Sequence, residues 1–132
     1  MRLRLETDYG IRCVLFLAQH TEYVQAGKIA AATQVPENVV PRVLSRLKKA
    51  GIVTARSGVM GGHKLRKKAD RITLYDIVDC MEDCIMLSCE EEIDNPEIPM
   101  ELVQSCLENI EDNMKDNMRK ITVQQLLDGT VE

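Results

Sequence analysis

The chain has 132 residues, of which 45% are hydrophobic and 29% charged, and its formal net charge is −4. This length suits one domain, or a small domain with a helical extension, and no apolar run approaches the roughly 20 residues that a membrane span needs. The start, MRLRLETDYG, lacks the apolar segment of a secretory signal, and five cysteines is an odd number for a disulfide framework. We therefore expect a protein of the reducing cytoplasm, where clustered cysteines more often serve metal or redox chemistry.

Charge is distributed unequally along the chain. Residues 1–72 hold 14 Lys and Arg against 5 Asp and Glu, which is +9, whereas residues 73–132 hold 3 against 16, which is −13. A basic half next to an acidic half indicates that one surface meets a polyanion while the other serves a different purpose.

Three helices are predicted in the basic half. The first begins near Thr7, whose side chain can cap it, and the second covers about residues 26–33. The third runs over residues 37–50, because its apolar residues keep a helical period and Gly51 is suited to end it. Pro41 lies about one turn inside this helix and is expected to distort its start, since proline donates no backbone hydrogen bond.

A hairpin and further helices are predicted next. The β-prone runs IVTA and HKLR flank SGVMGG, which indicates a two-stranded hairpin with its loop at residues 57–63. The run ITLYDIVDCMED predicts a helix capped by Thr73 and Asp76, and the acidic EEEIDNPEIP predicts an exposed loop. A long amphipathic helix is expected over about residues 100–120. It is followed by a last short helix, for which Thr122 and Gln125 form a second capping box.

Three helices followed by a hairpin, in a basic segment, is the order of a winged helix-turn-helix domain that binds DNA. The third helix would enter the major groove, where Arg42 can bond a guanine, Asn38 an adenine and Pro41 a thymine methyl. The hairpin would be the wing, whose glycines allow close approach to the backbone and whose cations neutralise phosphates. A merely solvated helix and hairpin would not account for the charge of +9. The candidate DNA contacts are Asn38, Pro41, Arg42, Ser45, Arg46, Lys49, Arg56, Gly61, Gly62, His63 and Lys64.

Five segments carry a family resemblance: MRL…DYGIR, VPENVVPRVLSRLKKAGIV, GGHKL, RITLYDIVDCMED and KITVQQLL. In this order they are similar to the bacterial regulators typified by IscR, NsrR and CymR, the Rrf2 family, over essentially the whole chain. The resemblance implies a homodimeric transcription factor that binds a roughly palindromic DNA operator. The fold class is then mainly α with a small β-hairpin wing, with residues 1–72 as the winged helix-turn-helix domain and 73–132 as sensor loop and dimerisation region.

The long helix supports the expected homodimer. In the family, this helix crosses the same helix of the partner, and here its apolar stripe is longer than so small a core needs. The alternative is a stripe packed within one chain. The stripe consists of Val103, Leu107, Ile110, Met114 and Met118.

The wing departs from the family pattern at two positions. Arg56 precedes Ser57 and Gly58, whereas relatives place arginine directly before the glycine. His63 stands where relatives often have an aromatic residue, which indicates a phosphate-binding or wing-packing side chain rather than a metal ligand.

Three of the five cysteines lie in CMEDCIMLSCEEE, residues 80–92. Cys80 and Cys84 are four residues apart, which would place them on one edge of a helix as small apolar side chains. By resemblance to the iron–sulfur members, Cys89 matches the first of three cysteine ligands and Cys106 the last. No cysteine lies between them, and Asn109 stands where a histidine ligand is expected, so the ligand set is incomplete.

Two interpretations of Cys89 and Cys106 remain open. A two-iron cluster would need further ligands near the partner's first helix, for which Asp8 and Cys13 are the candidates. Alternatively no cofactor is bound, and the two thiols form a pair that is oxidised.

Other functions are less consistent with the sequence. An enzyme is not expected, because neither histidine lies near a nucleophile motif and no phosphate loop or dinucleotide fingerprint occurs. A regulator without a cluster, controlled by a metabolite or a protein partner, is an alternative, as is a winged-helix module for protein interaction. The cations Arg42, Arg46, Lys48 and Lys49 argue against the last. The prediction is a DNA-binding regulator, most simply a repressor, that senses redox, metal or thiol status.

Overall fold

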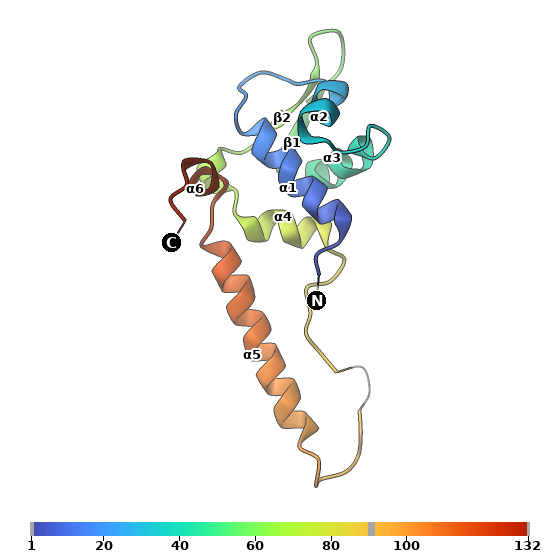
Figure 1. Ribbon diagram of the computed structural model, residues 1–132, viewed down its shortest axis with the longest axis vertical. Coiled ribbons are helices and arrows are strands. Elements are labelled where there is room, and N and C mark those ends of the chain that lie inside the picture. The colour runs from blue at the N-terminus through green and yellow to red at the C-terminus, as the bar shows by residue number, and fades with distance from the viewer. Residues whose placement is uncertain (1, 90–91, 132) are drawn as a thin grey trace.

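The computed structural model describes residues 2–89 and 92–131, which form a mainly helical fold with one β-hairpin. Strands β1 and β2 pair antiparallel, with Arg56 opposite Gly62 at the distal end. The expected fold class is therefore confirmed (Figure 1). The elements are α1 (Leu5–Leu17), α2 (Ala26–Thr33), α3 (Val40–Lys49), β1 (Val53–Arg56), β2 (Gly62–Leu65), η1 (Ala69–Arg71), α4 (Leu74–Met81), α5 (Met100–Arg119) and α6 (Val123–Asp128).

The core is built mainly from aliphatic side chains, to which α1, α2, α3, α4 and α6 contribute. Burying each of these side chains stabilises the fold by roughly 1.5–3 kcal/mol. Because α4 and α6 share this core with α1, α2 and α3, the acidic half of the chain supports the fold of the basic half. The fully buried members include Leu17, Ile29, Leu44, Ile77 and Val123.

The start of α1 differs from the prediction. Arg4 occupies the N-cap position and Thr7 lies inside the helix, fully buried. The Thr7 hydroxyl donates to the carboxylate of Glu82, beyond the end of α4, so the capping role predicted for Thr7 was wrong. A Cβ on Gly10 would lie 2.8 Å from Cγ of Met81, so glycine permits the close approach of α1 and α4.

Helix α3 begins at Val40, and residues 37–39 form a turn before it. Pro41 therefore sits in the first turn, where a backbone N–H has no partner within the helix and proline is well tolerated. The predicted distortion was wrong for this reason. Gly51 follows the helix with φ of +77°, which confirms that it ends α3 in the left-handed conformation.

Both predicted capping boxes are present. Thr73 accepts from the backbone N–H of Asp76, whose side chain accepts from the N–H of Thr73, and Thr122 and Gln125 repeat the pattern. Helix α4 nevertheless ends at Met81, so Cys84 lies outside it and does not share a helical edge with Cys80. Glu82 has extended backbone angles, and its carboxylate accepts from the N–H of Arg4.

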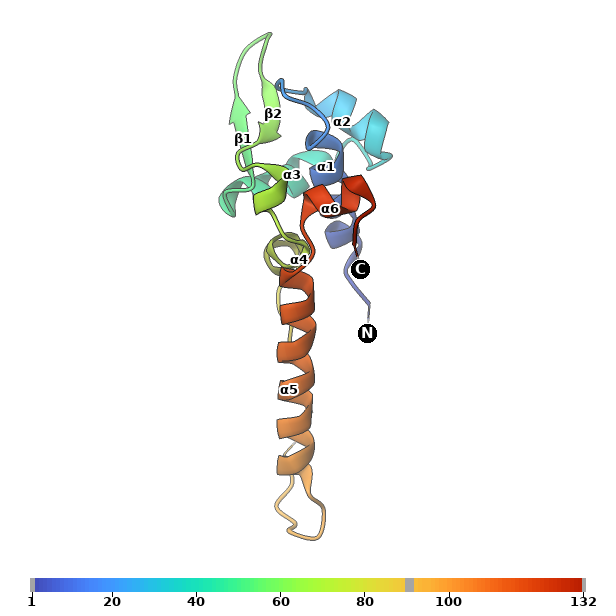
Figure 2. The same ribbon diagram turned by 90° about the vertical axis from the view of Figure 1, so that its left-hand side faces the viewer.

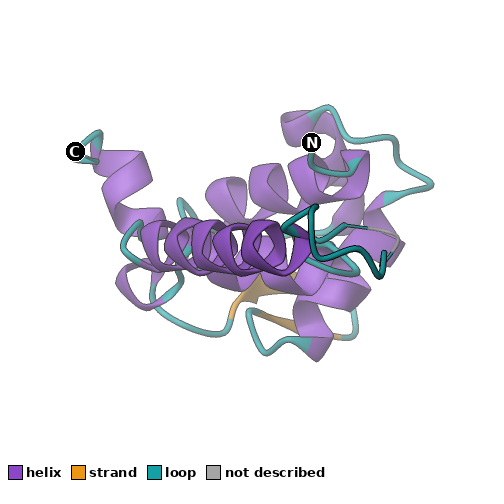
Figure 3. Ribbon diagram, turned by 90° about the horizontal axis from the view of Figure 1, so that it is seen from below, coloured by secondary structure: helices purple, strands orange, loops and turns teal. Residues whose placement is uncertain are grey.

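Helix α5 extends away from the rest of the molecule and runs back toward α4 from its far end (Figures 1 and 2). The described part of the segment between α4 and α5 lies beside this helix. All twenty residues of α5 are described, and none of them is buried. Near its C-terminal end the helix contacts α4, where Arg119 stacks on the ring of Tyr75 at 4.1 Å. Seen from below, α5 lies in front of the other helices (Figure 3). Among the described residues, no helix is long and apolar enough to cross a membrane.

Candidate nucleic-acid interface

The outward face of α3 carries most of the side chains predicted to contact bases. Arg42, Ser45 and Lys49 are exposed on the helix, and Pro41 is exposed in its first turn. Asn38 is also exposed, but it belongs to the turn that precedes the helix. The opposite face is buried in the core, so α3 is fixed by packing while its polar side remains open to a ligand.

Arg42 forms an ion pair with an acidic residue of α1. Its guanidinium lies 2.6 Å from a carboxylate oxygen of Glu6 in α1. The Arg42 side chain is 62% exposed, whereas that of Glu6 is 18% exposed. Arg42 is therefore open to solvent, but its release would leave a mostly buried carboxylate whose other cation is Arg4 at 3.8 Å.

Arg46 points toward α4, whereas the other side chains of α3 predicted to contact DNA are exposed on its outward face. It donates to the backbone carbonyl of Cys80 at 3.3 Å and to Asp83 at 3.0 Å, and it is half-buried. The Arg46 hydrogen bond, together with the charge of Arg4, lowers the pKa of the Asp83 carboxyl. Arg46 thus joins α3 to the segment after α4.

The glycines of the hairpin are required by contacts with the backbone. Strand β2 begins at Gly62, so the loop is residues 57–61 rather than 57–63. A Cβ on Gly61 would overlap the carbonyl oxygen of Arg56, and one on Gly62 would overlap the carbonyl oxygen of Val24. Gly62 also has φ of +137°, where a side chain is strained.

His63 packs the wing against the preceding loop. Its backbone N–H and C=O each pair with Val24 at 2.8 Å. Burial, aided by the charge of Lys48, lowers the pKa of His63, so the imidazole is neutral at pH 7. A neutral, half-buried ring favours the wing-packing role over phosphate binding.

The loop between α1 and α2 supports the wing. This support was not predicted from the sequence. The ring of Tyr23 lies 4.6 Å from the ammonium of Lys64 and 5.7 Å from the guanidinium carbon of Arg56. Gln25 donates from its side chain to the carbonyl of Val59 at 3.1 Å. No periodic signal marks these residues, because their contacts depend on how the loop folds over the hairpin.

The five cysteines fall into two groups. Cys13 is fully buried, and burial raises the pKa of its thiol to about 11. Cys80 is half-buried, and burial likewise raises its pKa to about 11. Cys84, Cys89 and Cys106 are exposed. Only the exposed thiols are open to oxidants or ligands.

The ligands considered for an iron–sulfur cluster are not brought together in one chain. Asp8 forms an ion pair with Arg12 at 3.0 Å, and Cys13 lies in the core. Among the described residues, no three His, Cys, Asp or Glu side chains gather closely enough to hold a metal ion. The described residues of one chain therefore do not by themselves form a ligand set for such a cluster.

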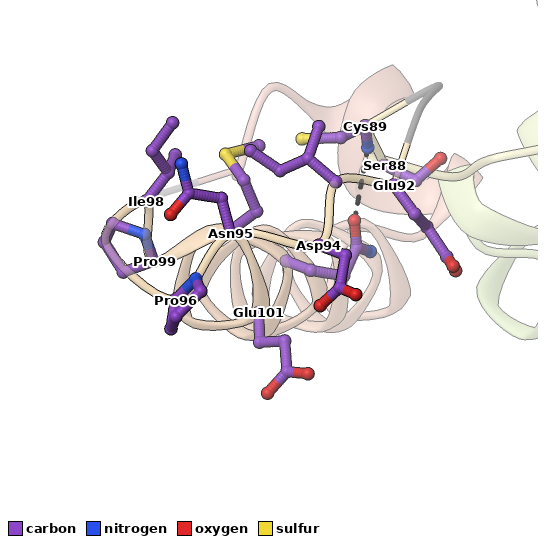
Figure 4. A pocket seen from close by; sticks show the side chains of 12 residues that line it. Ser88, Cys89, Glu92, Asp94, Asn95, Pro96, Ile98, Pro99 and Glu101 are labelled. Carbon is purple, nitrogen blue, oxygen red and sulfur yellow. Dashed lines mark hydrogen bonds between the residues drawn. The ribbon is translucent and has the colours of Figure 1, made fainter.

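Cys89 lies in the wall of a hollow of about 900 Å³ between residues 88–89 and 92–99 and the start of α5 (Figure 4). Its backbone N–H donates to the side chain of Gln104 in α5 at 3.2 Å. Earlier in the same segment, the N–H of Leu87 donates to Glu111 at 2.8 Å. A hydrogen bond from Lys115, with that of Leu87, lowers the pKa of Glu111, which keeps this acceptor ionised.

Comparison with known proteins is consistent with this architecture. The protein Aau3 of Rhizobium meliloti (strain 1021) is 37% identical over 110 residues, which cover 80% of this chain and 68% of Aau3. The structure of T. potens IscR has a TM-score of 0.78 at 22% identity, covering 99% of this chain and 89% of that one. The structure of CymR, the global cysteine regulator of B. subtilis, has a TM-score of 0.80 at 24% identity and covers 99% of both chains. These two structures support the fold alone.

The family itself is shown by a match along nearly the whole chain. The Rrf2 family, described as an iron-dependent transcriptional regulator, matches residues 3–129. Its members are transcriptional regulators rather than enzymes, as the sequence indicated. The winged fold, the exposed basic side of α3 and this match lead to one conclusion: the chain belongs to the Rrf2 family of transcriptional regulators.

Proposed function

We propose that the protein is a homodimeric, sequence-specific DNA-binding regulator, most simply a repressor, that binds a roughly palindromic operator. The observation that supports this best is the chemistry of α3 and the wing. Residues 38–69 contain nine Lys and Arg and no Asp or Glu, and they form α3 and the hairpin. Helix α3 would enter the major groove and the wing would hold the flanking backbone.

The basic and the acidic half of the chain have different roles in this proposal. Residues 1–72 bind DNA, and residues 73–132 supply the sensor loop and the dimerisation helix. The unburied apolar stripe of α5 supports the second assignment, since Ile110 is 52% and Val103 39% exposed. An aligned stripe on a projecting helix is suited to the same helix of a second copy.

Replacing Arg42 by Ala is expected to weaken binding to a selected operator by roughly 10- to 100-fold and to relax preference at one base pair.

Replacing Lys49 by Ala should weaken binding to all duplexes alike and reduce the slope of log affinity against log salt by about 1. Fluorescence anisotropy on duplexes selected from a random pool measures both. Lys120→Ala, an exposed cation beyond α5, is the matched control and should bind normally. Undiminished affinity of both R42A and K49A would refute the placement of α3 in the groove.

We further propose that the regulatory signal enters through Cys89 and Cys106. Both thiols are exposed, and Cys89 is tied to α5 through Gln104, two residues before Cys106. Residues two apart on a helix point about 200° apart around its axis. A disulfide within one chain therefore requires the loop to move, whereas one between protomers would join them covalently. A cluster shared between protomers is the alternative that involves the same cysteines.

Oxidation with diamide is expected to change operator affinity of the wild type, and Cys89→Ser or Cys106→Ser should abolish the response. The two thiols lose two electrons and two protons to diamide as the disulfide forms. Non-reducing electrophoresis separates an internal disulfide from a covalent dimer, and Cys84→Ser is the matched control because this thiol is also exposed.

Purification without oxygen distinguishes a thiol pair from an iron–sulfur cluster. A coloured preparation that contains iron and sulfide, and that bleaches in the Cys89 and Cys106 variants, would replace the thiol pair by a cluster. A colourless preparation whose DNA affinity is unchanged by diamide would favour regulation by a small effector bound in the hollow beside Cys89 over regulation by thiol oxidation.

A further inference from the structure

The tip of the wing presents two large apolar side chains to solvent. Val59 is 88% exposed and Met60 is 86% exposed, more than the other large hydrophobic residues recorded as exposed in the described chain. Neither serves the core, and neither belongs to the predicted set of DNA contacts. Exposure of this extent has an unfavourable hydration free energy, so the pair calls for an explanation beyond folding.

The wing tip is held in place by contacts from both sides. Gln25 donates to the carbonyl of Val59, and the N–H of Gly61 donates to the carbonyl of Gly58 at 3.0 Å. Gly58 has φ of +100°, and Gly61 has no room for a side chain. The tip is thus a turn of defined shape, which limits the entropy lost when it binds a partner.

The surroundings of the tip indicate the chemistry of that partner. Arg56 and Lys64 stand at the base of the tip, fixed over the ring of Tyr23. Residues 38–69, which include the whole wing, contain no acid. An apolar point flanked by cations matches a ligand with apolar faces between rows of anions, which is the groove of duplex DNA.

We propose that Val59 and Met60 enter the minor groove of the operator and wedge between two base pairs, so that the DNA bends away from the wing. This inference rests on the proposed DNA-binding function. Apolar wedges of this kind partly unstack a base step and kink the duplex toward the major groove. The flexible thioether of Met60 suits an irregular gap between bases. Pyrimidine–purine steps open most easily, so the operator should carry one under each wing tip.

The test compares variants on an operator selected with the wild type. Val59→Ser with Met60→Gln should weaken binding roughly tenfold and reduce the DNA bend measured by end-to-end energy transfer. The slope of log affinity against log salt should stay unchanged, because no charge is removed. Met60→Leu should retain both affinity and bend. Leu126→Gln, which also makes an exposed apolar residue polar but lies on α6, should behave as the wild type.

Each outcome is decisive for the wedge. Equal affinity and equal bend for the wild type and the double variant would overturn it and leave the proposed function intact. The wedge is also overturned if M60L is impaired as strongly as the double variant, since an apolar side chain would then not suffice. A wild type that selects no duplex at all would remove the proposed function and the wedge together. Thermal unfolding of each variant confirms that the hairpin is folded.

Discussion

Glutamate at both Val103 and Ile110 is expected to convert the proposed dimer into monomers and to weaken operator binding by about 100-fold or more. Both residues are exposed in the single chain, so the change should leave its fold intact. Glutamate also has a high helix propensity, which preserves α5. Two charges in each apolar stripe would face their copies across the interface and lose water there without a partner. In a dimer, binding of the first half-site makes binding of the second half-site intramolecular. A monomer binds only one half-site and lacks this gain in affinity.

Sedimentation equilibrium and anisotropy on a full operator and on a half-site check this prediction. The double variant should lose affinity for the full operator and keep that for the half-site. Glutamate at Ser105 and Asn109 adds the same charge to the opposite side of α5, where both residues are exposed, and should leave the dimer intact. A V103E/I110E protein that still sediments as a dimer would exclude α5 as the interface.

Gly62→Ala is expected to destabilise the protein by roughly 2–4 kcal/mol and to abolish operator binding. The new Cβ would overlap the carbonyl of Val24, and it would also be strained at φ of +137°. To relieve both, the hairpin must move off the α1–α2 loop, which breaks the backbone pairing of His63 with Val24. Urea unfolding and anisotropy measure the two effects.

Gly129→Ala separates strain from overlap. Gly129 has φ of +71°, but a Cβ there would meet no atom within 4 Å. The Gly129→Ala variant should therefore be destabilised by only about 1 kcal/mol and should bind DNA normally. Equal losses for the two variants would show that the contact with Val24 contributes nothing.

Local signals explain why much of the fold could be predicted from the sequence. Thr73 with Asp76 marks the start of α4, and Gly51 marks the end of α3, because capping depends on neighbours in the chain. The helical period of the apolar residues likewise predicted which side of α3 faces outward.

The differences between prediction and structure arise from contacts between distant segments. Glu82 is drawn to the first turn of α1, which ends α4 before Cys84, and this contact joins residues more than seventy positions apart. Arg46 has helical spacing with Arg42, yet it turns toward Asp83. Tyr23 supports the wing only because the loop before α2 lies against the hairpin. Helical periodicity carries no information about such pairs.

The short segment after α4 has a mechanical consequence for regulation. Asp83 bonds Arg46 of α3 at 3.0 Å and Arg4 at 2.7 Å, and the exposed Cys84 follows it directly. If Asp83 were withdrawn, the two guanidinium groups would lose their shared counterion and repel each other. Because the Asp83 side chain is 74% exposed, these ion pairs contribute little net stability, and the segment can leave α3 at low free-energy cost without unfolding the core. A displacement of the cysteine-containing segment would therefore change the charge beside α3 before it changed the fold.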